Sequence, residues 1–336
     1  MQVQQDRSLK SLNTFGIDTT AQYSAVLGSE SELPELSALQ QYGEKHILGG
    51  GSNVLLTGPL SGLLLLNRLS GKEVIKENEQ YVWLKVASGE VWHELVLYTI
   101  DQGWSGLENL ALIPGTVGAA PIQNIGAYGA EVKDVIEEVR YWHWKDAERR
   151  TLSNADCRFG YRDSIFKQEL KGQAFVTDVV FRLNKQAQLN TAYGAIREEL
   201  ERMQVTELTA KTVAEAVIRI RSSKLPDPKQ IGNAGSFFKN PLIPIAQFDR
   251  LQQDYADIPS YNAGQNMVKV PAGWLIERAG WKGVREGDTG VHSRQALVLV
   301  NYGHATGQEI WDLSSRIVAS IQERFGIELE REVQVW

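Results

Sequence analysis

Two glycine-rich segments are the stretches of this sequence best suited to hold a ligand with the backbone. The longer segment, Pro114 to Gly129, contains four glycines and three alanines and no charged residue. The shorter one, Gly49 to Asn53, lies between two apolar runs, a pattern typical of strand, turn and strand. Glycine lets another group approach closely and leaves backbone N–H groups accessible to phosphate or ring acceptors. The pair predicts a dinucleotide long enough to touch both, although small residues also suit a tightly packed buried loop.

Several other kinds of site are disfavoured by their spacing. The Gly49–Asn53 segment has neither the Gly-x-Gly-x-x-Gly spacing of the dinucleotide fold nor the Gly-Lys-Ser/Thr ending of a P-loop. His93-Glu94 is no zinc helix, because position 97 is leucine, and a histidine beside Trp92 is more often structural. Ser236 follows a glycine without the Gly-x-Ser-x-Gly pattern of a hydrolase. The sequence therefore predicts no metal site and no hydrolase triad.

Composition restricts the class of protein further. The 336 residues carry 41 acidic and 35 basic side chains, a net charge of −6 that disfavours a nucleic-acid partner. A single cysteine, Cys157, rules out an internal disulfide framework. We find no apolar run of membrane-spanning length and no secretory leader. We therefore expect a cytoplasmic monomer with small-molecule partners, no nucleic acid and no membrane.

Hydrophobic periodicity predicts the elements that carry these segments. A capping box at Thr212–Glu215 is expected to begin a helix that ends before the linker Leu225–Pro228. Segment 233–241 is expected to be a turn of small residues, and strict alternation in 327–335 places Val335 on the apolar face and Glu332 on the other. The remaining helices are expected at 31–41, 91–103 and 308–325, and the remaining strands at 62–67, 81–87, 138–144 and 175–183.

Seven motifs, in order along nearly the whole chain, resemble the UDP-N-acetylenolpyruvoylglucosamine reductase family. None is decisive alone, but their order is highly specific. The motifs are Gly49–Leu56, Pro114–Gly129, Arg158–Ser164, Lys224–Pro228, Asn233–Pro241, Ala272–Ile276 and Glu332-Val333.

The resemblance implies an α+β fold with a two-subdomain flavin-binding unit of the vanillyl-alcohol-oxidase (PCMH) type and a C-terminal α+β substrate-binding domain. It implies flavin subdomains at 1–70 and 71–222, and a substrate-binding domain at 223–336 that ends in the catalytic strand. The long stretch 184–207 with Tyr193, and Tyr261 within 258–263, resemble the form of the family that has an inserted tyrosine loop.

The resemblance also implies the chemistry: FAD takes a hydride from NADPH and reduces the enolpyruvyl group of a UDP-sugar. It assigns catalysis to Arg162, Ser236 and Glu332, and substrate binding to Tyr193, Lys224, Asn240, Tyr261 and Lys282. The FAD-binding positions are Gly49, Gly50, Gly51, Ser52, Asn53, Pro114, Gly115, Thr116, Gly118, Ala119, Asn124, Gly126, Ala127, Tyr128 and Arg221.

The residues alone leave several alternatives open. Arg162 could grip a carboxylate with its fork or form an ordinary surface pair with Asp163. Lys239 is a candidate to stabilise an alkoxide at Ser236, and Arg331 stands where some relatives carry proline. An oxygen-using sugar oxidase on the same flavin fold, or a nucleotide-sugar-binding protein without flavin, would fit the same motifs.

Overall fold

The computed structural model describes residues 2–264 and 266–336, which form two compact units. The first unit comprises residues 2–7, 21–50 and 61–223. The second comprises 8–20, 51–60 and the described part of 224–336. Each unit is described by itself below.

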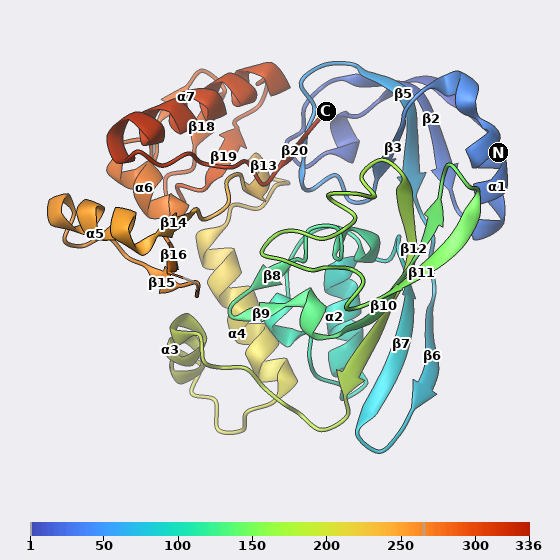
Figure 1. Ribbon diagram of the computed structural model, residues 1–336, viewed down its shortest axis with the longest axis horizontal. Coiled ribbons are helices and arrows are strands. Elements are labelled where there is room, and N and C mark those ends of the chain that lie inside the picture. Colours follow the sequence, from blue (N-terminus) through green and yellow to red (C-terminus); the bar gives the residue numbers. More distant parts are fainter. Residues whose placement is uncertain (1, 265) are drawn as a thin grey trace. The chain divides into compact units, whose positions relative to one another are not determined.

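Two sheets build the first unit (Figure 1). In the smaller sheet, ordered β1-β2-β5-β3, strands β3 and β5 pair in parallel. The larger sheet, ordered β11-β10-β12-β7-β6, is antiparallel throughout. The bounds are β1 Gln4–Ser8, β2 Thr20–Leu27, β3 Lys45–Leu48, β5 Leu60–Asn67, β6 Lys72–Glu77, β7 Tyr81–Ala87, β10 Ile136–His143, β11 Glu148–Ser153 and β12 Ala174–Asn184.

Helices α2 (Trp92–Asp101) and α4 (Ala210–Lys224) pack on the larger sheet. Their apolar side chains share one core with the alternating buried residues of β7 and with residues of β12, which is buried along most of its length. Phe175 and Trp142 of the larger sheet lie in a second core with Leu63 and Leu65 of the smaller sheet and with helix α1 (Leu33–Ala38). The strands predicted at 62–67, 81–87, 138–144 and 175–183 and the helix predicted at 91–103 are confirmed to within a few residues. The helix predicted at 31–41 is present but shorter.

The start of α4 differs from the prediction. Thr212 lies inside the helix, and the capping residue is Thr209. The hydroxyl of Thr209 accepts the Thr212 N–H at 3.2 Å, while the Thr212 hydroxyl accepts the Thr209 N–H at 2.9 Å. A threonine therefore takes the place that glutamate occupies in the usual capping box, and the box begins three residues earlier than predicted.

The second unit is built on the sheet β13-β19-β18-β17, against which the long helix α7 (Gly307–Phe325) packs. The predicted helix 308–325 is confirmed, with its predicted buried face and a left-handed cap at Gly326. The bounds are β13 Gly232–Ser236, β14 Leu242–Pro244, α5 Ile245–Asp254, β15 Tyr261–Asn262, β16 Met267–Lys269, α6 Ala272–Arg278, β17 Arg285–Glu286, β18 Thr289–Val291 and β19 Val298–Asn301.

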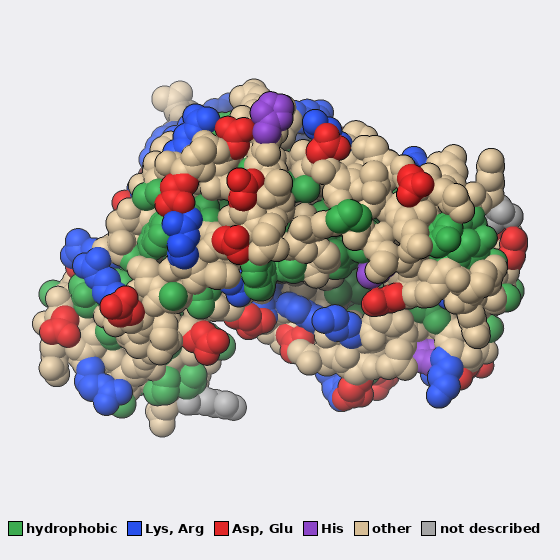
Figure 2. All heavy atoms as spheres, turned by 90° about the horizontal axis from the view of Figure 1, so that it is seen from above, with side chains coloured by type: hydrophobic (Ala, Val, Ile, Leu, Met, Phe, Trp, Pro, Cys, Tyr) green, Lys and Arg blue, Asp and Glu red, His purple; other side chains and the backbone are tan. Residues whose placement is uncertain are grey.

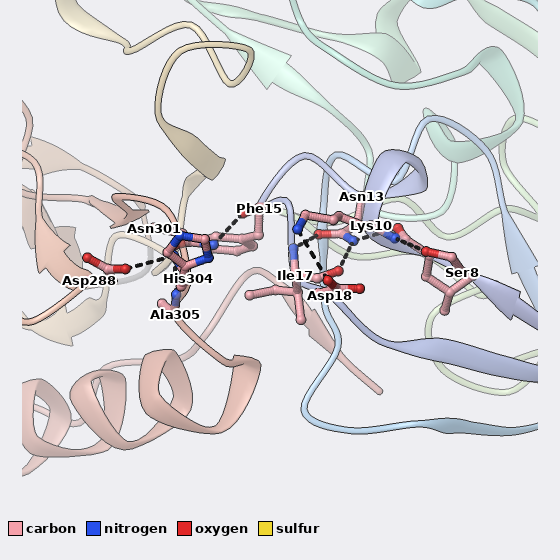
Figure 3. Close-up of polar contacts among 11 residues, drawn as sticks. Ser8, Lys10, Asn13, Phe15, Ile17, Asp18, Asp288, Asn301, His304 and Ala305 are labelled. Carbon is pink, nitrogen blue, oxygen red and sulfur yellow. Dashed lines mark hydrogen bonds and ion pairs between the residues drawn. The ribbon is translucent and has the colours of Figure 1, made fainter.

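Two segments from early in the chain complete the second unit. In Figure 3, Asn301 donates a hydrogen bond to the backbone oxygen of Phe15 at 2.9 Å, and Asn13 closes its own turn against Ile17. A Cβ added at Gly232 would lie 2.2 Å from the same Phe15 oxygen, so only glycine permits this approach. Strand β4 (Val54–Leu55) pairs in parallel with β20 (Gln334–Val335), which follows Glu332.

Two predictions for the second unit need correction. Segment 233–241 is not a turn: residues 232–236 form β13, which carries an irregularity between Asn233 and Ser236 with φ +69° at Gly235. In segment 327–335, Ile327, Leu329 and Val333 are buried as predicted, but Arg331 and Glu332 are both half-buried, only residues 334–335 form a strand, and Val335 is 38% exposed. The pairing with β4 takes over at that point and turns Val335 away from the core.

Charged side chains are distributed over the surface. Figure 2 shows basic and acidic side chains interspersed over the face drawn. Some form ion pairs within the second unit, such as Arg316 with Glu286 and Arg278 with Asp257. Within residues 2–264 and 266–336, no helix combines the length and apolarity required to span a bilayer. The same residues contain no cluster of three or more His, Cys, Asp or Glu that could hold a metal ion.

Candidate functional site

The first two residues of the shorter glycine-rich segment, Gly49 and Gly50, lie beside Gly115 and Thr116 of the longer one in the first unit. A Cβ added at Gly50 would lie 3.0 Å from the Cα of Gly115, and one added at Gly49 would lie 2.3 Å from the Thr116 hydroxyl. The second distance is too short for a real side chain, and the first would require the Gly115 backbone to shift by a few tenths of an ångström. Glycine at 49 and 50 therefore lets the backbones of the two segments meet.

Backbone donors are available at this meeting point. Among the described residues, none accepts a hydrogen bond from the N–H groups of Gly49, Gly50, Gly115 or Thr116. The next turn of the longer segment is different, because Gly118 donates its N–H to the Ser88 oxygen at 2.8 Å. Ala119 likewise donates to Thr116. The donors available to a ligand are therefore concentrated at residues 49–50 and 115–116.

The end of the longer segment is a hairpin that fastens the segment bearing Tyr193. Strands β8 (Gly126–Ala127) and β9 (Ala130–Glu131) flank Tyr128, whose φ is +50°. Asn109 donates its amide to the backbone oxygens of Tyr128 and Asn190, at 3.1 and 2.9 Å. The ring of Tyr193 packs edge-on against Tyr128 at 5.4 Å, directly before helix α3 (Gly194–Arg202).

Arg162 is held by the same hairpin. Its guanidinium donates to the Gly126 oxygen at 2.5 Å and to the Asn124 oxygen at 3.4 Å. The backbone of Arg162 is left-handed, with φ +54°, a conformation that a non-glycine residue adopts only when its surroundings enforce it. The side chain of Asn124 is fully buried and bonded to Glu131 and the Gly160 oxygen, so Asn124 supports the loop.

Arg221, on α4, adds a second cation close to Arg162. Its Nε donates to the Leu112 oxygen at 3.3 Å, and its charge interacts with the nearby Tyr128. Burial, with a contribution from Arg162, lowers the pKa of Arg221, while burial raises the pKa of Tyr128. Within the described part of the chain, no carboxylate pairs with Arg221. A half-buried cation without a carboxylate partner favours an anion nearby, so this donor set fits a group with phosphates or a carboxylate.

His93 binds the backbone of Leu112, just before the longer glycine-rich segment. Its Nδ1 accepts the N–H of Leu112 at 3.0 Å, and Leu112 has a left-handed φ of +58°. Burial, followed by the charge of Arg221, lowers the pKa of His93, which keeps Nδ1 unprotonated and able to accept. The structural interpretation of His93 is supported, and its role is to fix the Leu112 peptide together with Arg221.

In the second unit, the segments of Ser236 and Glu332 are neighbours. Residue Phe237, next to Ser236, accepts the Glu332 N–H on its backbone oxygen at 2.8 Å. Among the described residues, the Ser236 hydroxyl has no hydrogen-bond partner. The ammonium group of Lys239 pairs with Glu330, so the structure gives no support to Lys239 as the partner of Ser236.

The other positions named for the site also lie in the second unit. Gly51 and Asn53 contact the Thr14 N–H and the Glu332 oxygen, respectively, and Ser52 lies between them. Asn240 accepts the N–H of Ala272 at the start of α6. Lys282 pairs with Glu277, Tyr261 is 50% exposed, and Lys224 is exposed at the end of α4.

Comparison with known proteins identifies the family. A family model for the C-terminal domain of UDP-N-acetylenolpyruvoylglucosamine reductase matches residues 227–336, and one for an FAD-binding domain matches residues 23–153. The chain is 48% identical over 336 residues to the reductase of that name from Flavobacterium johnsoniae, covering 100% of both chains. It is 48% identical over 335 residues to that from Chromobacterium violaceum, covering 99% and 98%. The chain belongs to the UDP-N-acetylenolpyruvoylglucosamine reductase family.

A solved structure of the family agrees. The UDP-N-acetylenolpyruvylglucosamine reductase of Thermus caldophilus superimposes with a TM-score of 0.70 at 26% identity, covering 100% of this chain and 99% of that one. The predicted family and the α+β class, with an FAD-binding part followed by a C-terminal domain, are therefore confirmed. This member of the reductase family is a flavoprotein oxidoreductase of peptidoglycan synthesis, and its cofactor is FAD.

Sequence reasoning missed several residues that support this site. Asn109 and Asn190 fasten the hairpin, and the peptide of Leu112 links His93 to Arg221. An asparagine in the run Glu108-Asn109-Leu110 carries no local signal, because its partners lie 19 and 81 positions away. The left-handed backbone at Leu112 and Arg162 is equally invisible in the sequence.

Proposed function

We propose that this chain catalyses the NADPH-dependent reduction of the enolpyruvyl group of UDP-N-acetyl-3-O-(1-carboxyvinyl)-glucosamine to UDP-N-acetylmuramate. Membership of the reductase family along the full length supports the reaction class. The observation that carries the assignment of roles is the backbone ladder that makes the segments of Ser236 and Glu332 neighbours.

For cofactor binding, we propose that the free N–H groups of Gly49, Gly50, Gly115 and Thr116 hold the FAD, with Arg221 supplying positive charge. Bound FAD supplies hydride transfer, from NADPH and then to C3 of the enol ether. Residues 1–70 and 71–222 then serve as the flavin subdomains and 223–336 as the substrate-binding domain. The match of residues 23–153 to an FAD-binding domain supports a flavin-binding part before the C-terminal domain.

The chain's own residues act on the charge and the proton. When C3 gains a hydride, the electron pair of the double bond moves to C2 and its carboxylate, giving an enolate-like dianion. Arg162, whose guanidinium is held by the Gly126 oxygen, stabilises that dianion by its charge, and Glu332, when protonated, donates a hydrogen bond to it. Ser236 delivers a proton to C2, and its hydroxyl, which has no hydrogen-bond partner among the described residues, supports this role.

We assign substrate contacts to Tyr193, Lys224, Asn240, Tyr261 and Lys282. The amide nitrogen of Asn240 remains free to donate, because only its oxygen is used at the start of α6 among the described residues. NADPH and the sugar must each present a carbon to the same flavin. We therefore propose that they bind in turn at one place and give parallel lines in double-reciprocal plots.

The test is a pair of anaerobic stopped-flow measurements on the purified holoenzyme. NADPH should bleach the flavin absorbance, and the enolpyruvyl UDP-sugar should restore it with formation of UDP-N-acetylmuramate. A reduced flavin that is reoxidised only by oxygen would favour a sugar oxidase. A protein that releases no flavin on denaturation would favour a nucleotide-sugar-binding protein.

A further inference from the structure

We propose that Arg331 is a positioning residue that fixes Glu332 by tying the C-terminal segment to α7. This inference rests on the proposed function, in which Glu332 stabilises the anion formed from the substrate. Arg331 itself touches no group assigned to substrate, FAD or NADPH, so it acts through its neighbour.

The side chain of Arg331 stacks on and hydrogen-bonds to one turn of α7. Its guanidinium carbon lies 3.9 Å from the centroid of the Trp311 ring. Nε donates to the Ser314 hydroxyl and Nη2 to the Ser315 hydroxyl, each at 2.8 Å. These partners stand at positions i, i+3 and i+4 of the helix and therefore share one face.

The two serine hydroxyls are themselves oriented to receive the arginine. Ser314 and Ser315 both donate to the backbone oxygen of Trp311, at 2.7 and 3.0 Å. Each hydroxyl hydrogen is thus committed, and the oxygen lone pairs face the guanidinium. Arginine matches this arrangement better than lysine, because its donors are fixed in one plane and can stack on an aromatic ring.

The backbone on either side of Arg331 is held from the other direction. Lys239 donates its N–H to the Glu330 oxygen at 2.9 Å, and Glu332 donates its N–H to the Phe237 oxygen at 2.8 Å. Arg331 faces Phe238 between these two bonds, and its own N–H lies outside the ladder. The ladder sets the register of Glu332 against the strand of Ser236, and the Arg331 side chain sets the distance of the segment from α7.

The experiment compares the two flavin half-reactions in R331A, S315A, E332A and a control, R324A. Arg324 also lies over aromatic rings of the second unit, at 5.9 Å from the Tyr255 centroid, but at the far end of α7. We expect R331A to slow flavin reoxidation by the enolpyruvyl UDP-sugar roughly 10- to 100-fold, since a 1 Å misplacement can cost about 100-fold. Flavin reduction by NADPH and the KM for the sugar should stay within about threefold of wild type, and S315A should show a smaller loss of the same kind.

The outcomes separate this inference from the proposed function. If E332A slows reoxidation while R331A and S315A do not, Arg331 is merely structural. Equal slowing of both half-reactions in R331A, or a comparable loss in R324A, would also overturn the inference. If E332A reoxidises at the wild-type rate, the role of Glu332 itself fails. Should R331A not fold, S315A decides by the same criterion.

Discussion

The side-chain amide of Asn53 donates a hydrogen bond to the backbone oxygen of Glu332 at 3.3 Å, across 279 positions of the sequence. The next pairs of the same register, Val54 with Gln334 and Leu55 with Val335, form the parallel pairing of β4 and β20. The end of the first glycine-rich segment is therefore in direct contact with the segment that carries a proposed catalytic carboxylate.

This contact predicts that a substitution at Asn53 affects both the reaction with the sugar and the stability of the protein. In N53D the side chain keeps its size but loses the amide donor, and a carboxylate is brought toward the Glu332 oxygen. We expect N53D to slow flavin reoxidation by the enolpyruvyl UDP-sugar at least severalfold and to lower the melting temperature. Stopped-flow absorbance measures the rate of reoxidation, and a thermal melt of the holoenzyme measures the melting temperature. Wild-type values in both would show that the contact is dispensable.

FAD retention should depend on glycine at position 50. In G50A the new methyl group would meet the Gly115 backbone at 3.0 Å and push the two donor segments apart. The ratio of flavin absorbance to protein absorbance in the purified variant should fall several-fold. G28A is the matched control, since a Cβ there has no atom within 4 Å. A G50A protein as yellow as wild type would argue that FAD binds elsewhere.

Ser236→Ala should separate the half-reactions. Reduction of the flavin by NADPH requires no proton at a substrate carbon, so bleaching should proceed at the wild-type rate. Reoxidation by the sugar should fall by about 10²–10⁴-fold, the usual loss when a general acid is removed. Ser61→Ala, at an exposed position near the start of β5, serves as the control. If S236A reoxidises normally, the proton comes from another group.

Arg162→Ala should slow the same step through charge rather than proton supply. Loss of one preorganised donor typically costs about 10²–10³-fold. R162K should recover little of the loss, because lysine cannot bond the Gly126 oxygen and a carboxylate with one planar fork. Single-turnover reoxidation at several substrate concentrations measures the effect. Full activity of R162K would mean that a point charge is sufficient.

Stability should decrease as the pH falls below neutrality. Burial lowers the pKa values of His93 and His292 from the ordinary 6.5, so the unfolded chain binds more protons than the folded one. For His93, Arg221 adds to this effect and Glu94 opposes it; for His292, Arg294 adds to it. Their contribution is complete above about pH 6.5 and is lost as the pH falls through the lower folded values.

Glutamine at position 93 tests this pH dependence. Its amide oxygen can still accept the Leu112 N–H, but it does not titrate. The free energy of unfolding of H93Q, from urea titrations between about pH 5 and 7, should vary less with pH than that of wild type. An unchanged slope would remove His93 from the explanation.

Local patterns were sufficient to predict most elements of this fold. The alternation in Tyr81–Ala87 and the helical spacing of Ile310, Leu313 and Ile317 report burial of one face, and both elements formed as predicted. The predicted capping residue of α4, Thr212, was wrong because Thr209 carries the same hydroxyl group. The reciprocal hydrogen bonds between the two residues make Thr209 the cap. The prediction that Val335 is buried was wrong because a strand from residues 54–55, far away in the sequence, sets the environment of Val335.

The candidate site was predictable to the extent that its chemistry is local. Glycine at 49, 50 and 115 indicates a close approach of the backbone, but only the fold shows that these glycines approach each other. Only the fold shows, too, that the Gly118 N–H already donates a hydrogen bond to the Ser88 oxygen. The clamp of His93 and Arg221 on Leu112 joins residues over 100 positions apart and leaves no periodic trace.

The discontinuous second unit has a consequence for folding. Its early segments meet late ones: Phe15 bonds Asn301, and Thr57 bonds the Trp336 oxygen at 2.8 Å. Such contacts close loops of more than 200 residues, which raises the contact order and slows folding more than it reduces stability. We expect a fragment of residues 227–336, although it matches the family's C-terminal domain, to leave the edge of β20 and the Phe15-binding surface uncovered and to aggregate. This unit is therefore assembled only when both ends of the chain are present.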